Sequence, residues 1–485
     1  MPAPTTDFLG LSSMSLPIIS RYLFYLPVEL WSIVFLYVAF GQDPSTRPFY
    51  SARCTLLLVC RSWCSTAMSV PELWSTVLVD PDSTDAGVSA MLTRTAVHPY
   101  RVVIRQDMDR PSAPFRSPDS VMRNIISLLH ALLPSVSRWS SFDMHASHLP
   151  TIDQITALLL DLDAPVLRSL RISSHCWSIS PGDAVILQGA LVFRGQLSRL
   201  RHLSLFVVPL PWASVRPMPA LTHLTLESIR ASAFPTYRQY IDMFTAAPAL
   251  EFLVLRGLGC SMLPSAPVPF SFPSVRTLGF SLGVTAAPIS ASFVHLLKSF
   301  FFPRLCYLDI LFHPSSTQVP VPITDLRFAC KHVRLAGRHV NIDSMRALYP
   351  SFVGVETLDL RGADVEILEG LAPASRSFVA PRIDERWRVL PMLTAPSVAP
   401  NQSVILPFLT VLKVTIAHWH ELRFVLELRQ IIGSNRVQVL HCHIVPEPAG
   451  GDVGDAGVDH RAVVLSLVDA VEWVDKHPGI VTIHR

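Results

Sequence analysis

The sequence predicts an α/β protein in which a small helical module is followed by an irregular solenoid of parallel strands backed by helices. Two apolar segments with helical spacing fall within residues 21–80. From residue 136 onward, a short apolar pattern recurs at intervals of 21 to 33 residues, apart from one interval of 54. Half of the chain is hydrophobic and only 16% is charged, which favours a large buried core.

The helical module begins at Leu26-Pro27, where Pro suits the first turn of a helix because its missing N–H would have no intrahelical partner there. An apolar stripe follows at helical spacing, formed by Leu30, Ile33, Val34, Tyr37 and Val38. Trp31 and Phe35 lie off that stripe. A second helix repeats the spacing at Leu56, Val59, Cys60, Trp63 and Ala67, and a short turn starts at Pro71. Since about 55 residues can bury only one small core, the surplus apolar face predicts a protein-binding module.

This stretch resembles the F-box. The resemblance is carried by Leu26 to Leu30 (LPVEL), by Leu57, Val59, Cys60, Arg61 and Trp63, and by Leu73 and Trp74. It implies a Skp-family adaptor as partner and, through that adaptor, a cullin. The residues that would contact the adaptor or hold the contacting helices are Leu26, Pro27, Leu30, Ile33, Val34, Leu57, Val59, Cys60, Trp63, Leu73 and Trp74. An insert from Gly41 to Arg53 departs from the usual motif, resembles longer fungal variants and leaves the geometry of the second half open.

Beyond the module, strands are expected at 74–80 and 101–105 and helices at 88–99 and 121–133. From there an apolar residue is followed by others three and five positions later. The sets are Trp139/Phe142/Met144, Leu167/Leu170/Ile172, Leu200/Leu203/Leu205, Leu221/Leu224/Leu226, Leu250/Leu253/Leu255, Val275/Leu278/Phe280, Leu305/Leu308/Ile310, Cys330/Val333/Leu335, Val355/Leu358/Leu360, Leu409/Leu412/Val414 and Val437/Leu440/Cys442. The second and third members share one face of a strand, and the first turns into the same core.

Helical stretches between these strands would cover the back of the strand layer. They are expected at 152–162, 237–245, 293–301, 342–348 and 421–432. Several strands follow a Pro, which would end the preceding helix and set the turn into the strand. A final helix at 461–476 and a strand at 480–483 would hide the last apolar face, as the end of a repeat array requires.

The recurring pattern resembles leucine-rich repeats, whose period is about 20–29 residues. The Asn or Cys that commonly follows the strand in that family is replaced here, for example by His175, Val208 and Ile229. Without such a side chain the turn lacks the usual buried amide ladder. We therefore expect an array of irregular curvature with variable loops.

The predicted organisation has five parts. They are a flexible tail at 1–20, the F-box-like domain at 21–80, a linking segment at 81–135, the leucine-rich-repeat array at 136–445, and an acidic Gly-rich linker with a capping helix and strand at 446–485. The array has an insertion at about 362–406. The stretch 373–402 within it is either a loop or a degenerate repeat, and we hypothesise that it contributes to target binding.

Catalytic and cofactor motifs are missing from the sequence. It contains no phosphate-binding GxxxxGK[ST] loop, no GxSxG nucleophile elbow, no HExxH and no GxGxxG after a strand. We expect no enzyme activity, no cofactor and no metal site. His441 and His443 would share one face of a strand, but no third ligand is fixed beside them. The net charge of +3 comes from scattered basic residues, which argues against nucleic acid as a partner.

The cysteines are spread along the chain, mostly in apolar periodic segments, a usage that suits buried thiols in a reducing compartment. We therefore expect a cytoplasmic or nuclear protein. Residues 22–40 are apolar enough to raise the alternative of a membrane anchor. Pro27 and Glu29 near the middle of that stretch oppose insertion, since a carboxylate costs several kcal/mol in lipid.

The sequence thus predicts the substrate-recognition subunit of a Skp/cullin/F-box ubiquitin ligase, with an unknown protein as target. The alternative is a leucine-rich-repeat interaction scaffold of the same architecture without a ligase role. Arginines on neighbouring repeats could converge into an anion-binding cluster, although no such cluster is visible in the sequence itself.

Overall fold

A computed structural model provides the fold of the chain. It describes residues 27–40, 47–95, 97–106, 117–147, 149–159, 162–174, 197–208, 217–229, 233–262, 264, 267–282, 287–312, 326–337, 345, 348–360, 406, 408–416, 426, 437–444, 460–474 and 480–483. The chain divides into two compact units, Met1–Asp143 and Met144–Arg485. The predicted insertion at 362–406, including 373–402, lies outside the described residues except for Leu406.

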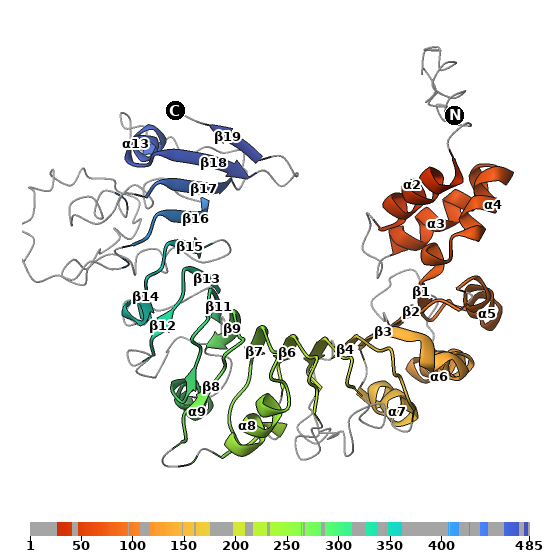
Figure 1. The fold of residues 1–485 in the computed structure, drawn as a ribbon, viewed down its shortest axis with the longest axis horizontal. Coiled ribbons are helices and arrows are strands. Elements are labelled where there is room, and N and C mark those ends of the chain that lie inside the picture. The colour runs from red at the N-terminus through yellow and green to blue at the C-terminus, as the bar shows by residue number, and fades with distance from the viewer. Residues whose placement is uncertain are drawn as a thin grey trace, which may run out of the picture. The chain divides into compact units, whose positions relative to one another are not determined.

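The first unit opens with helices α2 (Val28–Phe40), α3 (Arg47–Val59) and α4 (Arg61–Ser69) and the 3-10 turn η1 (Pro71–Trp74) (Figure 1). Strands β1 (Thr76–Val79) and β2 (Tyr100–Gln106) pair in parallel. Helices α5 (Asp85–Arg94) and α6 (Pro118–Leu132), the turn η2 (Leu133–Arg138) and strand β3 (Trp139–Ala146) follow. Both predicted strands and the helix at 121–133 are confirmed, whereas the helix expected at 88–99 begins and ends earlier.

The second helix of the module was predicted as continuous, and that prediction is wrong. Cys60 has an extended backbone, with φ −161° and ψ 168°, and separates α3 from α4. Its sulfur accepts a hydrogen bond from the N–H of Trp63 at 3.5 Å, so the thiol caps α4 instead of lying inside a helix. The supposed insert is also partly helical, because α3 already begins at Arg47.

The second unit is a parallel strand array in which neighbours in space follow the order of the chain. Its strands are β4 (Ser169–Ser174), β5 (His202–Phe206), β6 (His223–Glu227), β7 (Phe252–Arg256), β9 (Thr277–Leu282), β11 (Tyr307–Phe312), β13 (His332–Gly337), β15 (Thr357–Leu360), β16 (Val411–Ile416) and β17 (Val439–Ile444). Each coincides with a predicted apolar set, so the prediction of a solenoid-like α/β fold with a large parallel sheet is confirmed.

The apolar sets fix the register of the sheet. The middle residues of successive sets pair directly across the strands, through Leu170, Leu203, Leu224, Leu253, Leu278, Leu308, Val333, Leu358, Leu412 and Leu440. All of these side chains are buried. A shift of the strand pairing by one residue would turn the apolar side chains of that strand toward solvent. The apolar pattern that defines the repeats therefore also defines how the strands pair.

The turn before each strand is built from backbone bonds and proline. The N–H of Leu167 bonds to the carbonyl of Ala164, and Leu200, Leu221, Leu250, Leu305 and Leu409 bond to the residue three before in the same way. Pro165, Pro219, Pro248 and Pro303 occupy the second position of such turns, where their fixed φ is favourable. A carbonyl just before each strand then accepts N–H groups of the next repeat, as Arg168 does from Arg201 and His202.

Helices α7 (Leu149–Leu159), α8 (Tyr237–Thr245) and α9 (Ala287–Lys298) lie on one side of the strand array (Figure 1). The helix predicted at 237–245 coincides with α8, and the one at 152–162 corresponds to α7. No helix of the described residues between β4 and β11 lies on the other side of these strands, and we call that side the open face.

The helix predicted at 293–301 extends too far. Phe300–Phe301 form strand β10, paired with β8 (Phe270–Ser271), and β12 (Phe328–Ala329) pairs with β14 (Phe352–Val353) in the same way. The rings of Phe270, Phe272 and Phe300 pack edge to face at 4.9 and 5.0 Å. Aromatic side chains favour strands, and this packing explains the short strands. The helices predicted at 342–348 and 421–432 lie almost wholly outside the described residues.

The end of the array also differs from its prediction. Helix α13 covers only His460–Leu467, and Ala470–Val474 form strand β18, parallel to β17. Val471 pairs with Leu440, so Val468, Val471 and Trp473 continue the apolar spacing of the repeats. The predicted last strand is β19 (Ile480–Ile483), antiparallel to β18. The described helices include none that is long and apolar enough to cross a membrane.

We expect Leu224→Ala to lower the free energy of unfolding of the second unit by about 2–5 kcal/mol. The change opens a cavity among the buried middle residues of the apolar sets. Thr225→Ala on the open face is the matched control and should change stability by less than about 0.5 kcal/mol. Urea unfolding followed by circular dichroism measures both. Equal losses of unfolding free energy in the two variants would contradict the burial of Leu224.

The cysteines should differ in reactivity. Burial raises the pKa of the Cys330 thiol to about 12, and Cys306 adds to the shift, whereas Cys54 and Cys306 are exposed. Since the thiolate is the nucleophile, iodoacetamide at neutral pH should modify Cys306 well before Cys330 in the folded chain. Peptide-resolved mass spectrometry measures the rates, with the unfolded chain as control. Equal rates before unfolding would contradict the burial of Cys330.

Candidate protein-docking surface

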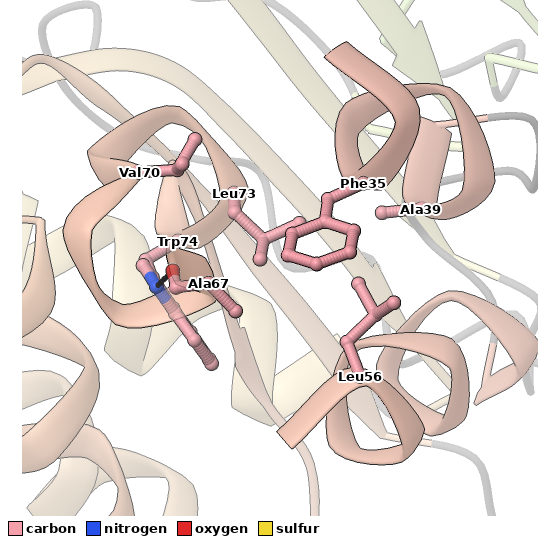
Figure 2. Close-up of a cluster of buried hydrophobic side chains, with 7 residues drawn as sticks. All are labelled: Phe35, Ala39, Leu56, Ala67, Val70, Leu73 and Trp74. Atoms are coloured by element: carbon pink, nitrogen blue, oxygen red, sulfur yellow. Dashed lines mark hydrogen bonds between the residues drawn. The ribbon is translucent and has the colours of Figure 1, made fainter. Parts of the chain in front are cut away.

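The helical module has one small core, drawn from all of its elements. Figure 2 shows its seven buried side chains, with Leu73 pointing toward the ring of Phe35. They are Phe35 and Ala39 of α2, Leu56 of α3, Ala67 of α4, and Val70, Leu73 and Trp74 around η1. The indole N–H of Trp74 donates to the carbonyl of Ala67 at 2.9 Å, which satisfies the polar atom of a buried ring. The hydrogen bond and the packing together fix η1 against α4.

A buried arginine holds the end of the module in place. Arg53 of α3 is buried, and its Nη1 donates to the carbonyls of Leu73 and Thr76, each at 3.2 Å. Its guanidinium also lies 5.4 Å from the centre of the Trp74 ring, and Arg94 lies 4.5 Å from it. Sequence reasoning missed Arg53 because it was assigned to a polar insert. The usable signal was its helical spacing to Leu56 and Leu57.

Three aromatic rings join α2 to α4. Trp63 lies 4.8 Å from Trp31 and 5.0 Å from Phe35, and Trp31 lies 5.7 Å from Phe35, measured between ring centres. Such contacts contribute about 0.5–1.5 kcal/mol per pair beyond the area they bury. The ring cluster therefore orients α2 and determines which of its faces points away from the core.

The face of α2 that points away from the core is apolar as well. We call Leu30, Ile33, Val34, Tyr37 and Val38 the α2 stripe, and all five are exposed, Ile33 to 61% and Tyr37 to 80%. Glu29 and Ser32 are the polar residues of this helix. A helix that is apolar all round is normally covered on every side. Because a contiguous exposed apolar strip marks an interaction surface, the α2 stripe is the candidate docking surface.

The predicted site residues that the structure describes fall into an exposed group and a group that packs against the core; Leu26 lies outside the described residues. The exposed group consists of Pro27, Leu30, Ile33, Val34 and Val59. Leu57, Cys60 and Trp63 are half-buried against the core, and Leu73 and Trp74 are buried in it. The exposed group can contact a partner, whereas the burial of Leu73 and Trp74 suits the second of the two predicted roles, that of holding the contacting helices.

The module exposes further apolar residues that the site prediction left out. Tyr37 and Val38 extend the α2 stripe, and Leu58 and Met68 are exposed on α3 and α4. The signal for Tyr37 and Val38 was present in the sequence as the last two members of the apolar stripe. Leu58 lies two residues after the buried Leu56 on α3, so it falls on the opposite, exposed face of that helix together with Cys54.

The open face of the array provides a second surface. His223 lies between His202 and Phe252, with ring centres 4.4 and 4.1 Å away, so three rings from adjacent strands form a row. Burial in this row lowers the pKa of His223, and His202 lowers it further, while Glu251 opposes the shift. The row is an aromatic feature that spans three strands of the open face.

A charged network crosses the same face. Arg256 of β7 bonds to Glu227 of β6 at 3.1 Å and to Asp309 of β11 at 2.6 Å. To reach Asp309, the side chain of Arg256 must pass over β9, which lies between β7 and β11. Gly279 of β9 has no side chain that could obstruct the side chain of Arg256, and a Cβ at Gly279 would lie 3.2 Å from Val254. Small residues on β9 thus allow charges two strands apart to meet.

Comparisons with known proteins give no relative. Neither a protein-family model, nor a curated protein, nor a solved structure matches the chain. Among the described residues, no group of three or more His, Cys, Asp or Glu side chains could hold a metal ion.

The two faces of α2 should respond differently to mutation. Phe35→Ala removes the central ring of the core and should cost about 3–5 kcal/mol. Tyr37→Ala, two residues away on the exposed face, should stay within about 0.5 kcal/mol of wild type. Thermal unfolding of the two variants measures the contrast. A larger loss for Tyr37→Ala would mean that the stripe packs inside the chain.

Proposed function

We propose that this protein is the substrate-recognition subunit of a Skp/cullin/F-box ubiquitin ligase. The observation that carries the proposal is that α2 is apolar on both faces while its own module covers only one. The uncovered α2 stripe would bind the Skp-family adaptor, and the resemblance of Leu26 to Leu30 and Leu57 to Trp63 to the F-box supports that partner. The α3–α4 break at Cys60 and the buried Arg53 would keep the docking helix in position.

The strand array would hold the protein to be ubiquitinated. Its resemblance to leucine-rich repeats supports this role, and so does an open face with varied polar and aromatic side chains. Chemistry would belong to other subunits. The receptor would raise the effective concentration of the target near a charged ubiquitin carrier, so that no nucleophile is needed in this chain.

The experiment that tests the proposal is co-purification of the full chain with a Skp-family adaptor. We expect wild type to capture the adaptor and the double variant Ile33→Asp/Tyr37→Asp to lose it, because carboxylates in a desolvated apolar contact are costly. Phe301→Asp is the matched control, since Phe301 is an apolar residue exposed to 62% on the strand array. It should capture the adaptor as wild type does.

Circular dichroism must show that both variants remain folded, which the exposure of Ile33 and Tyr37 makes the expected result. Failure of the folded wild type to capture the adaptor would contradict the ligase role. It would favour the alternative of an interaction scaffold with the same architecture.

A further inference from the structure

Four arginines lie on two adjacent repeats of the array. Arg168 and Arg201 precede β4 and β5 at equivalent positions, since the next residues, Ser169 and His202, pair across the strands. Arg171 lies within β4, and Arg199 lies in the turn before β5. All four side chains are exposed. We call this set the arginine patch.

Within the described part of the chain, none of the four has an ion pair or a side-chain hydrogen bond, unlike Arg256 and Lys331. Arg256 binds Glu227 and Asp309, and Lys331 lies 2.9 Å from Glu356. The described residues from 164 to 222 include no Asp or Glu. The described residues of these two repeats from Ala164 onward therefore supply no carboxylate to balance the patch, and a partner with negative charge would complement it.

The spacing of the charges indicates which negative groups fit. Residues three apart along a strand are about 10 Å apart, and neighbouring strands are about 4.8 Å apart. The patch therefore spreads its charge over an area instead of concentrating it around one point. Several single carboxylates along an extended segment match this layout better than one phosphate, which a tight cage of donors would hold.

An aromatic row adjoins the patch. His202 follows Arg201 directly, and its ring lies 4.4 Å from that of His223, which in turn stacks on Phe252. Phe252 is exposed to 38%. A segment that crosses the strands from β4 to β7 would meet the arginines first and the rings second.

We propose that the arginine patch and the His202–His223–Phe252 row bind an acidic segment of a partner protein, in which carboxylates are followed by an apolar or aromatic side chain. The carboxylates pair with Arg168, Arg171, Arg199 and Arg201. The apolar side chain packs on the rings. The proposal rests on the role proposed above for the array, that of holding a target protein, and it specifies the chemistry of the target.

Fluorescence anisotropy with the full chain tests the proposal. The probe is a short labelled peptide of alternating Asp and Glu ending in Phe. The reference peptides have Asn and Gln in place of the acids, or a single phosphoserine as the only charged side chain. The acidic peptide should bind best, and added salt should weaken it because the pairs are exposed. Arg168→Glu/Arg201→Glu should weaken its binding by about tenfold or more.

The matched control is Arg276→Glu/Arg304→Glu, the same charge change at two exposed arginines of later repeats, one directly before β9 and one in the turn before β11. It should bind within about twofold of wild type. Equal weakening by both double variants would show a non-specific charge effect and overturn the proposal. Tighter binding of the phosphoserine peptide would overturn the carboxylate assignment. Ile33→Asp/Tyr37→Asp should bind the acidic peptide as wild type does, so failure of this proposal is distinguishable from failure of adaptor binding.

Discussion

In-register stacking of one apolar row is the constraint on which the array depends. From Leu170 to Leu440, the middle residue of each set pairs directly with its equivalents on the neighbouring strands, so every strand buries the same positions. Because the buried positions are fixed, the side chains between them are free to vary on the open face. The ring row, the Arg256 network and the arginine patch all use that freedom without disturbing the core.

The helical module differs from the array because its core covers only one side of its first helix. Its core is too small to cover α2 on both sides, and the rings of Trp31, Phe35 and Trp63 decide which side is covered. Buried groups such as Arg53 and Trp74 keep the helices together, and the apolar α2 stripe is left exposed. An apolar surface of this kind is unfavourable in water unless a partner covers it. The module thus exposes an apolar helix face, whereas the array exposes varied side chains on its open face.

The strands could be predicted from the sequence because their apolar spacing repeats in every turn of the solenoid, and any one set is supported by the others. Predictions that depended on a single local pattern failed. Helical periodicity across residues 56–67 could not show that Cys60 would cap α4, since that depends on one backbone conformation. Val471 and Val474 fit a helical stripe as well as a strand, and pairing with β17 decided between the two.

The candidate site was predictable where it depended on periodicity and not where it depended on tertiary position. Leu30, Ile33 and Val34 could be assigned to a surplus apolar face from their spacing. The burial of Leu73, Trp74 and Arg53 depends on packing between α3, α4 and η1, which one sequence does not reveal. Likewise, Arg168 and Arg201 are 33 residues apart and become neighbours only through the register of β4 and β5.

The central claim is that α2 docks on a Skp-family adaptor through its exposed stripe. Hydrogen–deuterium exchange of the full chain with and without the purified adaptor tests it most directly, because a bound partner suppresses local opening of the segment it covers. The account predicts slower exchange in Val28–Phe40 when the adaptor is present and unchanged exchange in β4 to β7. An adaptor complex in which protection falls on the strand array while α2 exchanges as before would contradict it.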